Sequence, residues 1–156
     1  MSTDAELLRD VVRRHLRFGW WALLLFLSLG LTLEAFHGFK VDWYLSVAHE
    51  TRRLLWRLAH AHGALLALVN LLFAATLPAL EGFSAGARDL ASKGLLAASV
   101  LMPAGFFLAG FGIVGGDPGL SIVLVIPGGL ALFLAVLLSA RAATAGGAGG
   151  RKTRKR

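Results

Sequence analysis

The sequence contains no cysteine among its 156 residues. Disulfides, thiolate metal sites, a cysteine nucleophile and covalently attached c-type haem are therefore excluded. The sequence also shows no phosphate-binding loop, no hydrolase triad motif and no nucleic-acid-binding module. A binding or catalytic site would have to use histidine, carboxylates, asparagine, serine or the backbone.

Charged residues are also scarce. They make up 16% of the chain, against 56% hydrophobic residues, and the mean hydropathy is +0.69. An α-helix needs about 20 apolar residues to cross the hydrocarbon core of a bilayer. Three stretches without any charge meet this length, residues 58–80, 94–116 and 118–140, and a fourth apolar stretch precedes Glu34. The sequence therefore predicts an all-α integral membrane protein, a four-transmembrane-helix antiparallel bundle with spans near residues 18–36, 54–77, 94–115 and 119–140.

Residues 1–17 are predicted to form a cytoplasmic amphipathic helix before the first span. Thr3 and Glu6 have the spacing of a capping box. Apolar residues follow at helical intervals, and four arginines lie mostly off that stripe: Arg9, Arg13, Arg14 and Arg17. Two placements stay open. The helix could lie in the plane of the lipid headgroups, or it could extend the first span straight into the cytoplasm.

The formal net charge of +7 is concentrated at the two ends of the chain. The positive-inside rule therefore predicts that both termini are cytoplasmic. Residues 141–156 are predicted to be a disordered basic tail that, like the N-terminal arginines, contacts anionic lipid headgroups. The alanine-, glycine-, leucine- and arginine-rich composition suggests a bacterial inner membrane. Besides lipid, the expected partners are another membrane protein or further copies of the chain, and no nucleic acid.

Ionisable residues are predicted to gather at the outer end of the first two spans, since antiparallel packing brings these ends to one level. Helical spacing on the second span extends this group inward to an asparagine. Ionisable groups in a membrane pair, reach the interface or serve a function. The structural interpretation is an ion pair between Glu34 and Arg57 and an interhelical hydrogen bond from Asn70. The functional interpretation is a binding or proton-handling site in a polar cluster of Glu34, His37, Arg53, Arg57, His60 and Asn70.

Three of these residues are weak candidates for a metal or haem site. Glu34 and His37 form a Glu-x-x-His motif, and His60 would add an imidazole from the neighbouring helix. His60 and His62 point in different directions on a helix and do not chelate one ion together. No cofactor is predicted. The other two histidines, His15 and His49, are expected to contact solvent or headgroups.

The favoured function is that of a non-catalytic accessory or assembly subunit of a membrane complex. One alternative is a membrane enzyme or redox protein that uses Glu34, His37 and His60. A second alternative is a small oligomeric transporter or proton pathway, in which Asn70 continues a polar line inward. Small residues on the third span, Gly105, Ala109, Gly112 and Gly116, favour helix packing inside the bundle over a contact with another subunit.

Overall fold

The structure is a computed structural model that describes residues 3–80 and 82–149. Its four long helices are α1 (Asp4–Gly38), α3 (Glu50–Thr76), α4 (Ala85–Ala109) and α5 (Val125–Gly149). The connections contain the short helix α2 (Asp42–Leu45) and the 3-10 turns Val47–His49, Leu77–Ala79 and Leu120–Leu124. Within these described ranges, four helical segments are long and apolar enough to cross a membrane, by length and composition. The all-α fold with four long apolar helices is therefore confirmed.

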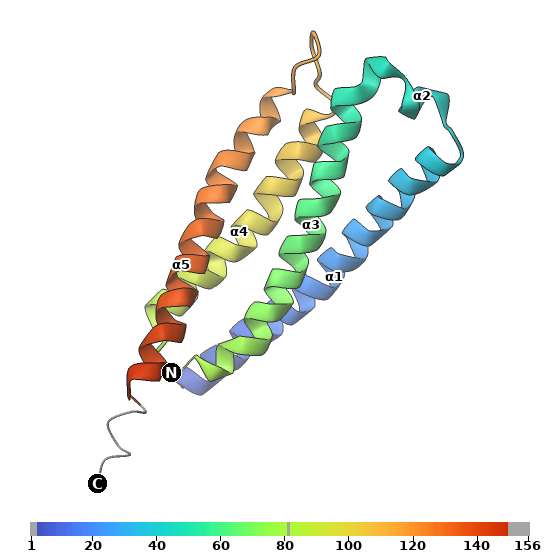
Figure 1. Cartoon of the computed structure of the whole chain (residues 1–156). Helices are drawn as coiled ribbons and strands as arrows, with labels where there is room; N and C mark the ends of the chain where they lie inside the picture. The colour runs from blue at the N-terminus through green and yellow to red at the C-terminus, as the bar shows by residue number, and fades with distance from the viewer. Residues whose placement is uncertain (1–2, 81, 150–156) are drawn as a thin grey trace.

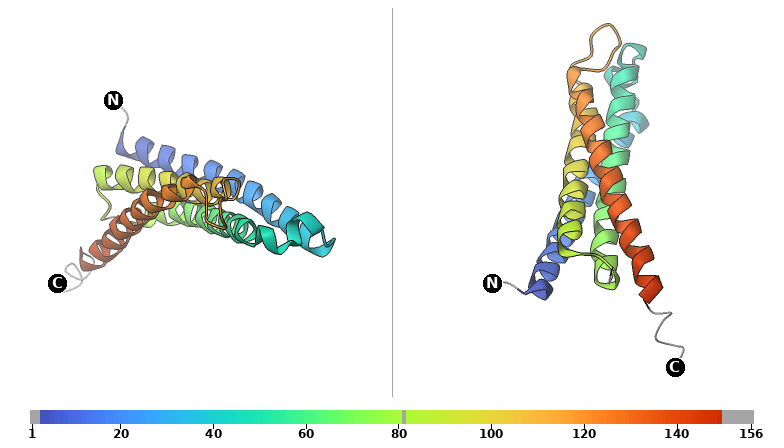
Figure 2. Two further views of the ribbon diagram at one scale, coloured as in Figure 1. Left: turned by 90° about the horizontal axis from the view of Figure 1, so that it is seen from above. Right: turned by 90° about the vertical axis from the view of Figure 1, so that its left-hand side faces the viewer.

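Each long helix packs antiparallel against the next one along the chain, α1 on α3, α3 on α4 and α4 on α5 (Figure 1). The start of α1 and the end of α5 lie at the same end of the bundle, with the α3–α4 connection beside them. The connection that contains α2 lies at the opposite end. Helices α1 and α5 lie on different sides of the α3–α4 pair (Figure 2). Helix α1 contacts α4 far less than it contacts α3.

Helix α1 is continuous from Asp4 to Gly38, so residues 4–17 are a straight extension of the first span and not a separate helix. The predicted capping box is present. The Thr3 hydroxyl accepts from the Glu6 N–H, and the Glu6 carboxylate accepts from the Thr3 N–H at 2.7 Å. With 35 residues at about 1.5 Å each, α1 is longer than the hydrocarbon core of a bilayer is thick.

Helix α4 ends at Ala109, whereas the sequence predicts a span to about residue 115. Apolar residues continue beyond this point, but Gly110 lies directly against the indole of Trp56, which donates to the Phe107 carbonyl at 3.2 Å. Gly115 and Gly116 then take φ angles of 62° and 90°, which side chains disfavour. Packing and glycine conformation thus end the helix where hydropathy gives no signal.

The last helix begins later and ends later than the pattern predicts. It follows a 3-10 turn and starts at Val125, so Pro127 falls in its first turn, where its missing N–H costs no hydrogen bond. It continues to Gly149, so residues 141–149, which the sequence places in a disordered tail, are helical. The rest of the predicted tail, residues 150–156, lies outside the described residues.

Helices α1 and α3 approach closely at glycine positions. A methyl group added to Gly63 of α3 would overlap the ring of Phe26 of α1, near its attachment point. By contrast, Gly86 in the first turn of α4 has open space around the corresponding position. The two glycines therefore form a matched pair for testing the α1–α3 packing.

We expect Gly63→Ala to lower the free energy of unfolding by about 1–3 kcal/mol, because the core has no room for the added methyl group. Gly86→Ala should leave stability unchanged or raise it by up to about 1 kcal/mol, through helix propensity alone. Thermal unfolding of both variants in the same detergent measures the difference. Equal midpoints for the two variants would contradict the observed packing.

Candidate functional site

A buried group of polar side chains joins α1, α3 and α4 near the end of the bundle that holds the start of α1. His15 and Asn70 are both fully buried, and Nδ1 of His15 lies 2.6 Å from Oδ1 of Asn70. Nε2 of His15 lies 2.8 Å from the hydroxyl of Ser92 on α4. The amide nitrogen of Asn70 donates to the Ser99 hydroxyl and to the Leu66 carbonyl, each at 2.8 Å.

These bonds determine how the hydrogen atoms are arranged. A backbone carbonyl only accepts, so the nitrogen of the Asn70 amide faces Leu66 and its oxygen faces His15. Nδ1 of His15 therefore donates, and when the ring is neutral its Nε2 accepts from the Ser92 hydroxyl. The same hydroxyl accepts from Arg14 at 2.8 Å. In the described part of the chain, every buried side-chain polar atom has a partner.

The expectation that His15 contacts solvent or headgroups is wrong. His15 shares the buried face of α1 with Val11 and Gly19, each four residues away. The helical spacing of His15 with apolar residues was the available signal for its burial. Its hydrogen-bond partners could not be found in this way, because they come from two other helices. The expected interhelical hydrogen bond of Asn70 is confirmed.

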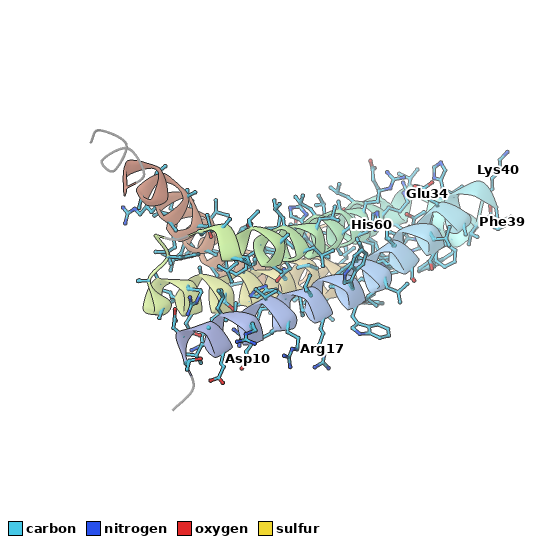
Figure 3. The ribbon with its side chains drawn as sticks, turned by 90° about the horizontal axis from the view of Figure 1, so that it is seen from below. Asp10, Arg17, Glu34, Phe39, Lys40 and His60 are labelled. Atoms are coloured by element: carbon cyan, nitrogen blue, oxygen red, sulfur yellow. The ribbon has the colours of Figure 1, made fainter. Side chains whose placement is uncertain are left out.

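The polar residues that the sequence predicts to gather at the outer end of the first two spans are dispersed. Glu34, His37 and Arg57 are exposed, and no ion pair joins Glu34 to Arg57 within residues 3–80 and 82–149. Figure 3 shows Glu34 near the α2 end of α1, with His60 closer to the middle of the bundle. His60 is instead within 2.7 Å of the Phe26 carbonyl through Nδ1.

The remaining members of the predicted cluster have separate partners. Arg53 donates to the carbonyls of Tyr44 and Ser46, at 2.7 and 2.8 Å, and so fastens the α2 connection to α3. Asn70 lies about 15 Å further along α3 than His60, at a rise of 1.5 Å per residue. In the described ranges, no group of three or more histidine, aspartate or glutamate side chains is placed to hold a metal ion. A chemical role for these residues stays a prediction.

A groove of about 960 Å³ lies between α1 and α4. Its walls are mostly apolar, with Phe18, Trp21, Leu25 and Leu29 from α1 facing Val100 and Phe107 from α4. One end differs. There the lining consists of the charged residues Asp10, Arg13, Arg14 and Arg17, which we call the rim. The sequence alone gives no signal of this groove, because the groove depends on how far α1 and α4 stand apart.

The rim is anchored by contacts between α1 and α4. Arg14 donates to Ser92, and Asp4 forms an ion pair with the buried Arg88 at 2.5 Å. The side chains of Arg13 and Arg17 are exposed and form no hydrogen bond or ion pair with any other part of the chain that the structure describes. Asp10 and Arg17 project outward from the same end of α1 (Figure 3).

Comparisons with protein-family models, curated proteins and solved structures gave no match.

The polar group joining three helices predicts a non-additive response to mutation. We expect His15→Leu and Asn70→Leu each to cost about 1–3 kcal/mol, because each leaves buried partners unsatisfied. The double variant should cost clearly less than the sum of the two single variants. Either single substitution already breaks the hydrogen bond between His15 and Asn70, so the second cannot break it again. Unfolding midpoints of the four proteins of this cycle measure the coupling. Simple additivity would show that the two side chains do not interact.

Proposed function

We propose that this small four-helix membrane protein is a non-catalytic accessory protein that binds an amphiphile, a molecule with a polar head and a long apolar tail, in the groove between α1 and α4. The observation that carries the proposal is the polarity of the groove. Its charged residues are confined to the rim, and the remaining lining is almost wholly apolar. Ligand sites in proteins commonly combine an apolar lining with a few polar groups that fix orientation.

The depth of the rim supports an orientation in which the polar head of the amphiphile lies at the rim and its apolar tail lies along the walls. Arg14 of the rim bonds to Ser92, which is next to the exposed Lys93, the last charged residue of α4. From residue 94 onward α4 carries no charge. The rim therefore lies where α4 passes from polar to apolar sequence, as the headgroup region of a bilayer requires. The walls extend from there toward the middle of the bundle, in the direction of lipid tails.

The accessory role agrees with the open face of α1. Trp21 and Leu25 in the groove wall are 71% and 63% exposed, so no helix of the described chain covers them. The enzyme alternative requires Glu34, His37 and His60 to act on a ligand, and the proton pathway requires Asn70 to continue a polar line inward. Asn70 is instead engaged by three partners within the bundle. With both termini in the cytoplasm, the rim would lie in the cytoplasmic leaflet of a bacterial inner membrane.

Photoactivatable lipids test the proposal. The protein is reconstituted with phosphatidylcholine or phosphatidylglycerol that carries a diazirine in the acyl chain, and cross-linked peptides are mapped by mass spectrometry. We expect labelling of α1 and α4 on the groove walls by at least one of the two lipids. Ala104→Trp should reduce it several-fold, because Ala104 lines the groove and an indole would fill it.

The control is Val136→Trp, which adds the same indole to an exposed position of α5 outside the groove lining. It should leave labelling of α1 and α4 unchanged. If both variants label like the unmodified protein, or if α5 is labelled as strongly as the groove walls, the groove is ordinary lipid-facing surface and the proposal is wrong.

A further inference from the structure

We infer that the groove selects lipids whose headgroup is a net anionic phosphodiester, and that Arg13 and Arg17 bind this phosphate. The inference rests on the proposed function and adds the class of ligand. It depends on the charges of the rim, where three guanidinium groups and one carboxylate lie within two turns of α1.

Arg13 and Arg17 are the two groups placed to bind an anion. They are four residues apart, so their side chains lie on one face of α1, where two like charges repel each other. The described part of the chain supplies neither with an acidic partner. A phosphate between them would relieve this repulsion, and the planar fork of donors on each guanidinium matches phosphate oxygens.

Arg14 has a different role, although it also lines the rim. Its guanidinium donates to the Ser92 hydroxyl, which in turn bonds to the buried His15. Arg14 therefore positions α1 against α4 and contributes its charge to the rim from a fixed place. The roles in the rim therefore differ: Arg13 and Arg17 bind the headgroup, and Arg14 positions them.

Asp10 distinguishes between two classes of lipid. A carboxylate beside the phosphate site would repel an anionic headgroup but attract the ammonium group of an ethanolamine headgroup. Three positive charges against one negative charge favour the net anionic lipid. Removing the carboxylate therefore distinguishes the two classes of lipid. Asp10→Asn should strengthen the binding of phosphatidylglycerol. If the site instead recognised an ethanolamine headgroup, the same substitution would weaken lipid binding.

The continuous lining ties the phosphate site to a lipid rather than to a free ion. Directly beyond Arg17 the lining becomes Phe18 and Trp21, and it stays mainly apolar to Leu29. An acyl chain packs against these walls and keeps its headgroup at the depth of the rim, and a free phosphate has neither contact nor anchor. Glycerol phosphate without acyl chains should therefore not displace the lipid.

Native mass spectrometry of the full chain, released from nanodiscs that contain equal amounts of phosphatidylglycerol and phosphatidylcholine with identical chains, measures the selection. We expect one retained lipid per chain, with phosphatidylglycerol preferred. The double variant Arg13→Gln/Arg17→Gln should reduce that preference about tenfold, because two charge-assisted contacts are lost. Arg13→Lys/Arg17→Lys keeps the charge without the fork and should give an intermediate preference.

Arg9→Gln is the matched control. It removes the same charge from the same end of α1, outside the groove lining, and should keep the preference. Helix content and elution volume verify that each variant folds, which we expect since the altered side chains are exposed.

Four results would overturn the inference. The first three are equal retention of the two lipids by the unmodified protein, an equal loss in Arg9→Gln, and displacement by glycerol phosphate. The fourth is measured in nanodiscs with phosphatidylethanolamine in place of phosphatidylcholine: a preference of the unmodified protein for the ethanolamine lipid, together with a lower phosphatidylglycerol signal in Asp10→Asn. If the photoactivatable lipids still label the groove walls, amphiphile binding stands and the headgroup assignment alone is wrong. If they do not, the proposed function is wrong as well.

Discussion

The hydrogen bonds of His15 hold this bundle in its observed arrangement, because they are the place where α1 is joined to both α3 and α4. Through Asn70 and Ser92 a single imidazole links three helices, and Ser99 completes the group from α4. In a membrane, helix association gains little from hydrophobicity, so shape and hydrogen bonding decide which helices meet. A buried polar group that is fully satisfied favours one arrangement over others, since any other would leave donors without partners.

The groove follows from the position of this junction. Near its start, α1 is tied to α4 by Arg14 and by the ion pair of Asp4 with Arg88. Further along, α1 stays close to α3, where Gly30 accommodates the His60 ring and Gly63 accommodates Phe26. Its contact with α4 is correspondingly slight. A helix that is fixed to one neighbour along its length, and to the other mainly at one end, leaves space between itself and the second neighbour.

The sequence predicted what depends on neighbours along the chain. Of the contacts between helices, it predicted the hydrogen bond of Asn70 and missed most others. Charge-free stretches predicted the four long helices, and Thr3 with Glu6 predicted the first cap. The end of α4 at Ala109 was missed because it depends on Trp56, which comes from α3. The burial of His15 was missed because a histidine among arginines resembles a headgroup contact until its partners are known. The outer residues, from Glu34 to His60, have the spacing of a cluster, but their side chains bond to nearby backbone or point outward.

The proposed headgroup site and the polar junction occupy neighbouring positions of one helix. Arg13 and Arg17 face the groove, while Arg14 and His15 between them hold α4. The backbone from which these two side chains extend is thus held by residues that are already bonded, which reduces the entropy lost on binding. The relation is reciprocal. A ligand that binds only the folded chain stabilises the fold that forms its site, so an occupied rim would strengthen the slight contact between α1 and α4. The groove would then be part of what defines the bundle, because the charges proposed to select the headgroup belong to the same turn as the hydrogen bonds that hold α1 to α4.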